Sequence, residues 1–322
     1  VNKFQSIVND FSHIQTAHCE NGVTVGLLNN KGLKFMNEPL AFGLGSGLFY
    51  IHIPFLKVNG GPAISFRSMP GSIFKKTCKA LNVNIQRKKF RSALVAEKFL
   101  DDRLDAGDIV GCQVGVYNLP YFPVAYRFHF NAHNLIVYGR EGDNYLISDP
   151  VMETTTTLTR EELSKVRFAQ GALAPKGHIY YTKTAPIVTE AMIRKGIIQG
   201  VKKTIRNMLY IPCRAVGIRG IKHTAKKISK WRDKLGERKA GLFLGQIVRM
   251  QEEIGTGGGG FRFMYAAFLE QASERLANDS LMGISEQFTK SGDLWRDSAL
   301  QMSGIYKGRI TTQSDFNKSA EI

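Results

Sequence analysis

Residues 133–150, HNLIVYGREGDNYLISDP, carry the clearest structural signal in this chain. Two runs rich in β-branched and aromatic residues, 133–138 and 145–148, flank a polar loop with two glycines, and this pattern predicts an antiparallel hairpin. His133 opens the first run and Asp149 follows the second, 16 residues later. Because a hairpin of this length returns to its start, we expect the imidazole and the carboxylate to lie side by side.

A second signal lies at residues 19–32, CENGVTVGLLNNKG, where apolar residues at helical spacing and a terminal Gly32 predict a short helix that begins at Cys19. The positive end of a helix dipole stabilises a thiolate. A cysteine nucleophile also needs a base within hydrogen-bond reach and a group that orients this base. We therefore predict a catalytic triad of Cys19, His133 and Asp149.

Each of these three residues also has an ordinary structural explanation. A cysteine is most often a small buried apolar side chain, a histidine at the start of a strand is usually half-exposed, and an aspartate before proline commonly forms a turn. The order and joint spacing of the three favour the catalytic interpretation. The helix start and the hairpin select Cys19 over the other cysteines, Cys78, Cys112 and Cys213.

The four cysteines lie far apart and form neither a CxxC pair nor a Cys/His pattern, so we expect no metal site and no disulfide scaffold. Free thiols are typical of a reducing compartment, and we expect a cytoplasmic protein. Residues 1–11, VNKFQSIVNDF, do not resemble a secretory signal, and no run approaches the roughly 18 apolar residues of a membrane span.

Length and patterning predict two domains in an α+β protein. The chain has 322 residues, of which 43% are hydrophobic and 22% charged, as in ordinary globular proteins. Residues 1–185 mix β-rich runs with helical windows and are predicted to form the catalytic domain. Residues 186–322 are predicted to be mainly helical, with a frayed polar tail after Gly308. The helical windows of this second domain are 187–209, 219–235, 240–254, 262–277 and 280–303.

The net charge of +17 is concentrated in one segment, residues 194–239, which contains 15 lysines and arginines and two acidic residues. Such a run is most often a solvated face. Nucleic acid is disfavoured as a partner, because aromatic residues are few in this segment and it contains no recognisable nucleic-acid-binding motif. The alternatives are an acidic protein partner and peripheral contact with an anionic membrane, since apolar residues are interleaved with the basic ones.

A first glycine-rich motif superficially matches a dinucleotide-binding loop. Gly43, Gly45 and Gly47 fail that pattern because Leu48 stands where the third glycine belongs. We expect instead that these glycines let the backbone pack tightly near the nucleophile helix, with Ser46 facing the site.

A second motif, four consecutive glycines at 257–260, is either a flexible hinge or a loop of close approach. In the second interpretation the bare N–H groups of Gly258 and Gly259 meet an acyl or pantetheine chain. Arg262 follows and could hold a phosphate or carboxylate. With Ser46, these residues are the candidate substrate-binding groups.

Residues 17–50, AHCENGVTVGLLNNKGLKFMNEPLAFGLGSGLFY, resemble the N-terminal domain of the butirosin biosynthesis protein H-like family, in which His-Cys, a short helix, Ser/Asn-Glu-Pro and Phe-Gly-Leu-Gly-Ser-Gly follow one another. Residues 252–272, EEIGTGGGGFRFMYAAFLEQA, resemble the helical C-terminal domain of that family. The stretch at 133–150 is also similar to the motif of double-glycine leader peptidases, which process bacteriocins. The resemblance covers about residues 10–305 and implies a papain-like N-terminal domain.

This resemblance implies an acyltransferase that takes an acyl group from an acyl carrier protein thioester. Cys19 would accept the acyl group, His133 would act as the base, and Asp149 would orient it. The phosphopantetheine belongs to the carrier, so the chain itself needs no cofactor. The acceptor would be an amine or hydroxyl of a small or lipid-like molecule. The carrier is acidic, which suits the basic segment 194–239.

One departure concerns the oxyanion hole. Papain-like enzymes usually carry a glutamine six residues before the nucleophile, whereas this chain has His13 there. The candidate donors are the backbone N–H of Cys19 and the side chain of Gln15, with His18 directly beside the nucleophile.

Two other functions compete with acyl transfer. One is a cysteine peptidase or amidase of the leader-processing type, which is disfavoured because such peptidases are normally fused to transporter segments. The other is a catalytically silent binding module, which is disfavoured because all three residue types of the triad are present.

Overall fold

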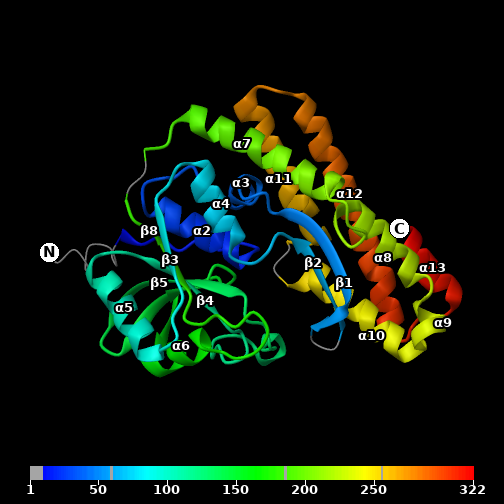
Figure 1. The fold of residues 1–322 in the computed structure, drawn as a ribbon, viewed down its shortest axis with the longest axis horizontal. Coiled ribbons are helices and arrows are strands. Elements are labelled where there is room, and N and C mark those ends of the chain that lie inside the picture. The colour runs from blue at the N-terminus through cyan, green and yellow to red at the C-terminus, as the bar shows by residue number, and fades with distance from the viewer. Residues whose placement is uncertain (1–9, 59–60, 185–186, 255–256) are drawn as a thin grey trace. The chain divides into compact units, whose positions relative to one another are not determined.

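The structure is a computed structural model, and the residues that it describes are 10–58, 61–184, 187–254 and 257–322. The chain forms two compact units, and Figure 1 labels most of their helices and strands. The first unit contains the residues up to Ala41 and Pro70–Met192, and the second contains Phe42–Met69 and Ile193–Ile322. The predicted boundary at 185/186 falls on undescribed residues, as does most of the segment 1–11 for which we expected no secretory signal.

The first unit is built on a six-stranded antiparallel sheet with the order β3-β8-β4-β5-β6-β7. The predicted hairpin is confirmed, because β5 and β6 pair with Ile136 opposite Ser148 and a tight turn at 142–143. His133 is the first residue of β5, and Asp149 directly follows β6. The strands are β3 (Ile85–Lys88), β4 (Val110–Val114), β5 (His133–Glu141), β6 (Asn144–Ser148), β7 (Thr156–Thr159) and β8 (Ile179–Thr182).

Alternation along the strands assigns the two faces of this sheet to different helices. Leu135 and Val137 belong to a buried apolar cluster with residues of α5 (Ala93–Asp105) and α6 (Arg160–Arg167). Ile136 points the other way, toward Gly26 in α2 (Cys19–Asn29). The remaining helices near this unit are α3 (Glu38–Leu44), α4 (Ser72–Ala80) and the short η1 (Val124–Tyr126).

Helix α2 lies very close to the sheet because two glycines, one turn apart, face it. A Cβ atom on Gly22 would stand 2.3 Å from Cβ of Pro150 and 2.2 Å from Oγ1 of Thr16. A Cβ atom on Gly26 would stand 2.5 Å from Cδ1 of Ile136. These contacts bring the first turn of α2 directly against Pro150, the residue after Asp149.

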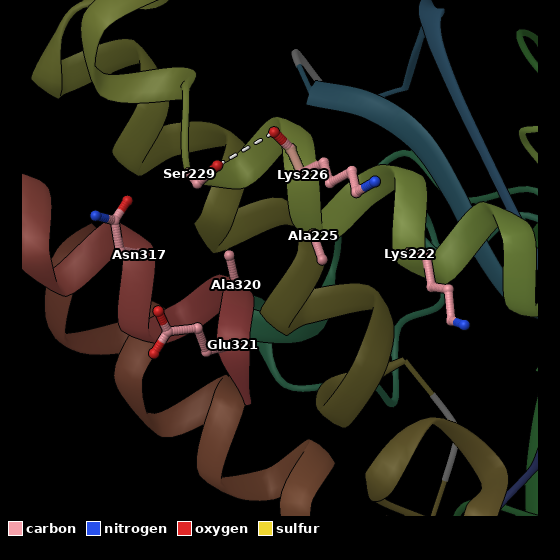
Figure 2. Close-up of a pocket in the computed structure, with 7 residues that line it drawn as sticks. All are labelled: Lys222, Ala225, Lys226, Ser229, Asn317, Ala320 and Glu321. Atoms are coloured by element: carbon pink, nitrogen blue, oxygen red, sulfur yellow. Dashed lines mark hydrogen bonds between the residues drawn. The ribbon is translucent and has the colours of Figure 1, made fainter.

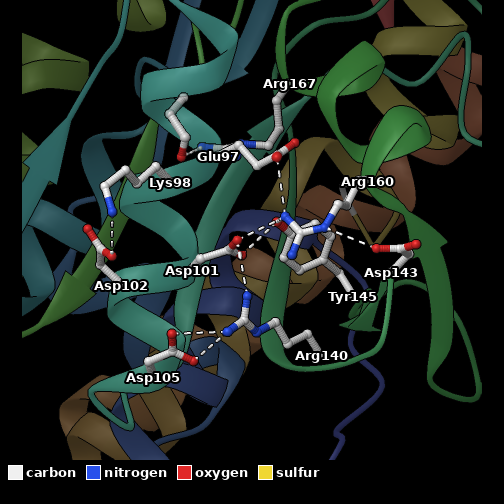
Figure 3. A network of polar contacts seen from close by, with 11 residues as sticks. Glu97, Lys98, Asp101, Asp102, Asp105, Arg140, Asp143, Tyr145, Arg160 and Arg167 are labelled. Atoms are coloured by element: carbon white, nitrogen blue, oxygen red, sulfur yellow. Dashed lines mark hydrogen bonds and ion pairs between the residues drawn. The ribbon is translucent and has the colours of Figure 1, made fainter.

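A polar network ties α5 to the hairpin (Figure 3). Asp101 accepts hydrogen bonds from Tyr145 Oη at 2.8 Å and Arg160 Nη1 at 2.8 Å, and Arg140 Nη1 approaches it at 3.1 Å. Arg140 also pairs with Asp105 at 2.8 Å. Single exposed ion pairs contribute little, but a network that includes a buried tyrosine restrains the hairpin that carries His133 and Asp149.

The second unit combines one hairpin, β1 (Leu48–Val58) with β2 (Gly61–Arg67), and a set of helices. Its helices confirm all of the predicted helical windows, and π-helical turns at Arg206–Tyr210 and Arg249–Glu253 extend two of them. In the described residues, no helix is both long enough and apolar enough to cross a membrane. The helices are α7 (Glu190–Ile205), α8 (Gly217–Ile228), α9 (Trp231–Leu235), α10 (Glu237–Val248), η4 (Gly259–Phe261), α11 (Arg262–Leu276), α12 (Ser280–Tyr306) and α13 (Gln313–Glu321).

The segment 42–69 was predicted to belong to the first domain, but the structure groups it with the helical unit. The ring of Phe42 stacks on Phe261 with a centroid distance of 4.9 Å. The hydroxyl of Tyr50 donates to Thr224 Oγ1 at 2.8 Å, inside the protein. Long-range contacts of this kind leave no trace in local sequence patterns, which explains the difference.

The prediction of a frayed tail after Gly308 is wrong. Thr312 and Asp315 form a capping box at the start of α13, in which each side chain accepts a hydrogen bond from the other residue's backbone N–H. Phe316 on this helix is completely buried. The cap satisfies the free backbone groups of a short polar helix, and the single aromatic anchors it.

Candidate active site

Cys19 is the first residue of α2, as predicted, and its side chain is almost buried, with 7% exposed. His18 is the N-cap of this helix, and its Nδ1 atom accepts a hydrogen bond from the backbone N–H of Asn21 at 3.3 Å. The thiol therefore stands at the positive end of the helix dipole, which stabilises a thiolate.

The hairpin brings His133 and Asp149 together. Nε2 of His133 donates to Oδ2 of Asp149 at 2.6 Å, and the aspartate is fully buried. Tyr121 donates its hydroxyl hydrogen to the same oxygen at 2.8 Å, and the backbone N–H of Val151 donates to Oδ1 at 3.2 Å. Three donors thus fix the position of the carboxylate, and Nδ1 of His133 is left for the thiol.

Electrostatics at this site favour a charged imidazole. Burial on its own lowers the pKa of His133, but the charges of Asp149 and Cys19 and hydrogen bonds with both outweigh it and raise the pKa to about 10. The ring of Phe122 lies edge-on to the imidazole, with centroids 5.2 Å apart, and covers it. The three predicted residues therefore form one buried cluster, in which the sulfur of Cys19 lies beside an imidazole whose charged form is favoured.

Asn134, the residue after His133, also lies at this site and was not predicted from the sequence. Its Nδ2 atom lies 3.8 Å from Sγ of Cys19, within the distance of a hydrogen bond to sulfur. The same atom donates to the carbonyl oxygen of Ala132 at 3.0 Å, and Oδ1 accepts from the hydroxyl of Tyr180 at 2.8 Å. The strand alternation that turns Asn134 toward α2 was available from the sequence, but a polar residue in an apolar run gave no specific signal.

Glu38, in the Asn-Glu-Pro motif, is a second residue whose role was not predicted from the sequence. Its carboxylate accepts hydrogen bonds from the backbone N–H groups of His18 at 2.6 Å and Ala17 at 3.0 Å, and another from the side chain of Asn21. Burial raises the pKa of Glu38, and these hydrogen bonds oppose the shift. Glu38 therefore fixes the turn that leads into Cys19.

We expect Glu38→Ala to lower the free energy of unfolding by about 1–3 kcal/mol, because two backbone N–H groups lose their acceptor. The rate at which iodoacetamide alkylates Cys19 should also fall, since the turn before the nucleophile loosens. Urea unfolding and timed alkylation measure both. The exposed Glu161→Ala, in the first turn of α6, is the matched control. Equal behaviour of the two variants would contradict this role.

Glu20, next to the nucleophile, is a buried carboxylate with a structural task. It accepts hydrogen bonds from the backbone N–H groups of Gly71 at 3.0 Å and Ile73 at 2.8 Å, at the start of α4. A carboxylate at this position satisfies free N–H groups and complements the helix dipole. It joins the first turns of α2 and α4.

The candidate oxyanion donors differ in their surroundings. Gln15 is exposed. Both ring nitrogens of His13 are engaged, Nδ1 with Ser148 Oγ at 2.8 Å and Nε2 with the carbonyl oxygen of Met152 at 3.0 Å. His18 caps α2. The backbone N–H of Cys19 is one of the groups at a helix start that have no partner within the helix.

The other cysteines lie in different environments. Cys78 and Cys112 are fully buried, and burial raises the pKa of both thiols. Cys112 points into the apolar cluster between the sheet and α5 and α6. Cys213 is exposed, and all four cysteines are free. Among the described residues, no group of three His, Cys, Asp or Glu side chains could hold a metal ion.

The candidate substrate-binding residues all lie in the second unit, and the structure shows internal contacts for them. The backbone N–H of Ser46 donates to the carbonyl oxygen of Gly43 at 2.9 Å. The N–H of Gly259 donates to the carboxylate of Glu252 at 3.0 Å. Gly258 has a positive φ of 85° and precedes this contact.

Arg262 is buried and supports the glycine loop from within. Its Nη1 atom donates to the carbonyl oxygen of Gly260 at 2.7 Å, and its guanidinium lies 3.8 Å from the ring centroid of Trp295. Burial lowers the pKa of Arg262 to about 9. The loop of close approach predicted at 257–260 therefore meets protein groups in this structure.

Two family models match the chain. The model described as "Butirosin biosynthesis protein H, N-terminal" matches residues 18–150, and the model described as "Domain of unknown function (DUF4872)" matches residues 161–322, half of the chain. The chain belongs to the butirosin biosynthesis protein H-like family. All three candidate triad residues lie within the first match. The family borders do not coincide with the structural units, since 42–69 lies in the first match and β8 in the second.

Among solved structures, the chain is similar to a protein described as a "putative C39-like peptidase from Bacillus anthracis". The identity is 15% and the TM-score 0.37, over 55% of this chain and 96% of that one. None of the curated proteins matches the chain. With the family assigned, the predicted α+β class, a papain-like N-terminal part and a mainly helical C-terminal part, is confirmed. The family assignment supports a papain-like cysteine enzyme.

Proposed function

We propose that the chain is an acyltransferase that uses Cys19 as its nucleophile, His133 as its acid and base, and Asp149 as the orienting group. The observation that carries this proposal is the 2.6 Å hydrogen bond between His133 and the buried Asp149. Cys19 is hydrogen-bonded to the same imidazole. Family membership supports a role in biosynthesis. The donor is the thioester of an acyl carrier protein.

The reaction has two steps. The Cys19 thiolate attacks the thioester carbonyl, the carbon–sulfur bond of the donor breaks, and the departing thiolate takes the proton of the His133 imidazolium. An amine or hydroxyl of the acceptor then attacks acyl-Cys19 and gives its proton to His133, which restores the thiolate–imidazolium pair. Exchange of one thioester for another costs little free energy, so a cysteine suits a thioester donor.

The basic segment of the second unit supports docking of an acidic carrier. Its lysines and arginines are mostly exposed on α7 and α8. Large apolar side chains are exposed among them, as a protein interface requires. Complementary charge would mainly accelerate association. These apolar residues are Ile198, Ile205, Leu209, Tyr210 and Ile218.

A hollow of about 410 Å³ lies on the same basic segment, between α8 and α13 (Figure 2). Lys222 and Lys226 line it from α8, whereas Asn317, Ala320 and Glu321 line it from α13. The lining contains two lysines and one glutamate, and this positive balance suits the phosphate of a carrier's prosthetic arm.

A cysteine peptidase is the second candidate function, because the same three side chains would serve it with water in place of the acceptor. A catalytically silent module is the third.

Incubation with an acyl carrier thioester, followed by intact mass measurement, tests the proposal. We expect a mass increase equal to the acyl group, which Cys19→Ala abolishes. Cys213→Ala, which removes the exposed thiol, is the matched control and should retain the adduct. Cleavage of Gly-Gly leader peptides without an acyl adduct would indicate the peptidase instead. The absence of both reactions would indicate the catalytically silent module.

A further inference from the structure

We propose that the side-chain amide of Asn134 is a catalytic hydrogen-bond donor that stabilises the oxyanion formed when Cys19 is acylated. The inference rests on the proposed function in one respect, that Cys19 attacks an acyl carbonyl. It does not depend on which donor supplies the acyl group or on which acceptor takes it.

The orientation of the amide follows from its partners. The carbonyl oxygen of Ala132 can only accept a hydrogen bond, so the atom 3.0 Å away must be the Nδ2 of Asn134. The Oδ1 atom then accepts from the hydroxyl of Tyr180 at 2.8 Å. Because an amide nitrogen carries two hydrogens, the second N–H of Nδ2 is available for Sγ of Cys19, 3.8 Å away.

The amide is also held rigidly. Asn134 is 2% exposed and lies on β5, opposite Gln113 of β4, while Tyr180 reaches it from β8. The side chain is thus restrained by the hydroxyl of Tyr180 on one side and by the backbone carbonyl of Ala132 on the other. Donors that are fixed before the reaction lose no free energy to reorganisation when charge develops, which is the basis of strong oxyanion stabilisation.

The chemistry requires such a donor beside the sulfur. When Sγ of Cys19 bonds to the carbonyl carbon, the π electron pair of the carbonyl moves to its oxygen. This oxygen is bonded to the same carbon that the sulfur has attacked. Charge leaves the sulfur and appears on this oxygen, two bonds away, so an N–H that is fixed beside the sulfur can donate to it. The oxyanion then collapses, the carbonyl re-forms, and the leaving group departs. The backbone N–H of Cys19 supplies the second donor.

Two reagents separate this role from a structural one. p-Nitrophenyl acetate acylates a thiol through an oxyanion, whereas iodoacetamide alkylates it by displacement at a saturated carbon, without one. We expect Asn134→Ala to slow acetylation of Cys19 by about 10²-fold, the effect of removing one oxyanion donor. Alkylation should change by only a few-fold. Intact mass, with Cys19→Ala as the blank, follows both adducts.

Tyr180→Phe is the matched control, because it removes the hydroxyl that binds Oδ1 and leaves the N–H groups in place. We expect it to slow acetylation only a few-fold. Asn134→Asp keeps an acceptor for Tyr180 but has no N–H, and it should slow acetylation as much as Asn134→Ala when rates are compared at their pH plateaus. A normal alkylation rate in each variant shows that the site is still folded.

Other outcomes would overturn the inference. If acetylation and alkylation slow equally in both Asn134 variants, the residue acts on the thiol or on the fold and not on the oxyanion. If neither slows, it has no part in acylation. Rapid acetylation of the wild type without reaction with a carrier thioester would refute only the proposed function. A wild-type Cys19 that takes up no acetyl group would refute both.

Discussion

Asp149→Asn is expected to slow acylation of Cys19 by about 10³–10⁴-fold. The amide has the shape of the carboxylate but no charge, and its N–H would face Nε2 of His133. The imidazole would then need the tautomer that carries its proton on Nδ1, the nitrogen required by the thiol. Acetylation by p-nitrophenyl acetate, followed by intact mass, measures the effect.

The pH dependence should change in a defined direction. Asp149 and Cys19 raise the pKa of His133 from its ordinary value of 6.5 to about 10, despite the opposing effect of burial. In the wild type, acylation by a thioester, whose departing thiolate takes a proton, should therefore fall only as the pH rises through about 10, where the imidazolium loses that proton. Without the charge of Asp149 this fall should occur at lower pH.

The same linkage predicts the stability profile. A histidine whose pKa is raised in the folded protein contributes stability that is complete below its ordinary pKa and is lost as the pH rises through the folded value. The contribution of His133 should therefore decline between about 6.5 and about 10, and Asp149→Asn should flatten this decline. Urea unfolding at a series of pH values measures it.

Asp102→Asn is the matched control for charge removal. Asp102 is half-exposed on α5 and forms an ion pair with Lys98 at 3.5 Å. Its variant should keep the wild-type rate and pH profile. If Asp149→Asn behaved like Asp102→Asn, the buried hydrogen bond to His133 would have no role in the reaction.

Gly22→Ala should be the most damaging single-methyl substitution near the site. The added Cβ would lie 2.3 Å from Cβ of Pro150, a ring atom that cannot rotate away, and 2.2 Å from Oγ1 of Thr16. Overpacking of this kind typically costs about 1–3 kcal/mol of unfolding free energy. Displacement of Pro150 would also move Asp149 away from His133, so acylation should fall together with stability.

Gly283→Ala provides the control. Gly283 is also in a helix, α12, but nothing lies within 4 Å of the position its Cβ would take. Alanine is the better helix former by about 1 kcal/mol, so this variant should be as stable as the wild type or more so. Unfolding in urea compares the two. A wild-type stability for Gly22→Ala would show that α2 can shift on the sheet without cost.

The hairpin at 133–150 and the helix at 19–32 could be predicted because their signals are local. Alternating β-branched residues and a polar glycine-containing loop encode the hairpin, and helical spacing followed by glycine encodes the helix. The triad geometry followed from these two elements. The helical windows of the second half could be predicted for the same reason.

Other features depend on partners that are distant in sequence. The segment 42–69 joins the helical unit through contacts such as Tyr50 with Thr224. The C-terminal residues form the helix α13 because the side chain of Phe316 is buried against the rest of the unit. The glycine loop at 257–260 is bound by other parts of the protein. The N–H of Gly259 donates to Glu252, and the carbonyl oxygen of Gly260 accepts from Arg262.

Local patterning therefore established which elements exist and which three side chains could form a triad at their ends. Only the tertiary structure decided what surrounds the thiol. Asn134 reaches Sγ because α2 lies on that face of β5, and Glu38 holds the turn before Cys19 from a position 19 residues further along the chain. The physical reason is that hydrogen-bond networks in a buried site are closed by side chains from separate elements. Their closeness depends on packing, here on glycines that let a helix approach a sheet.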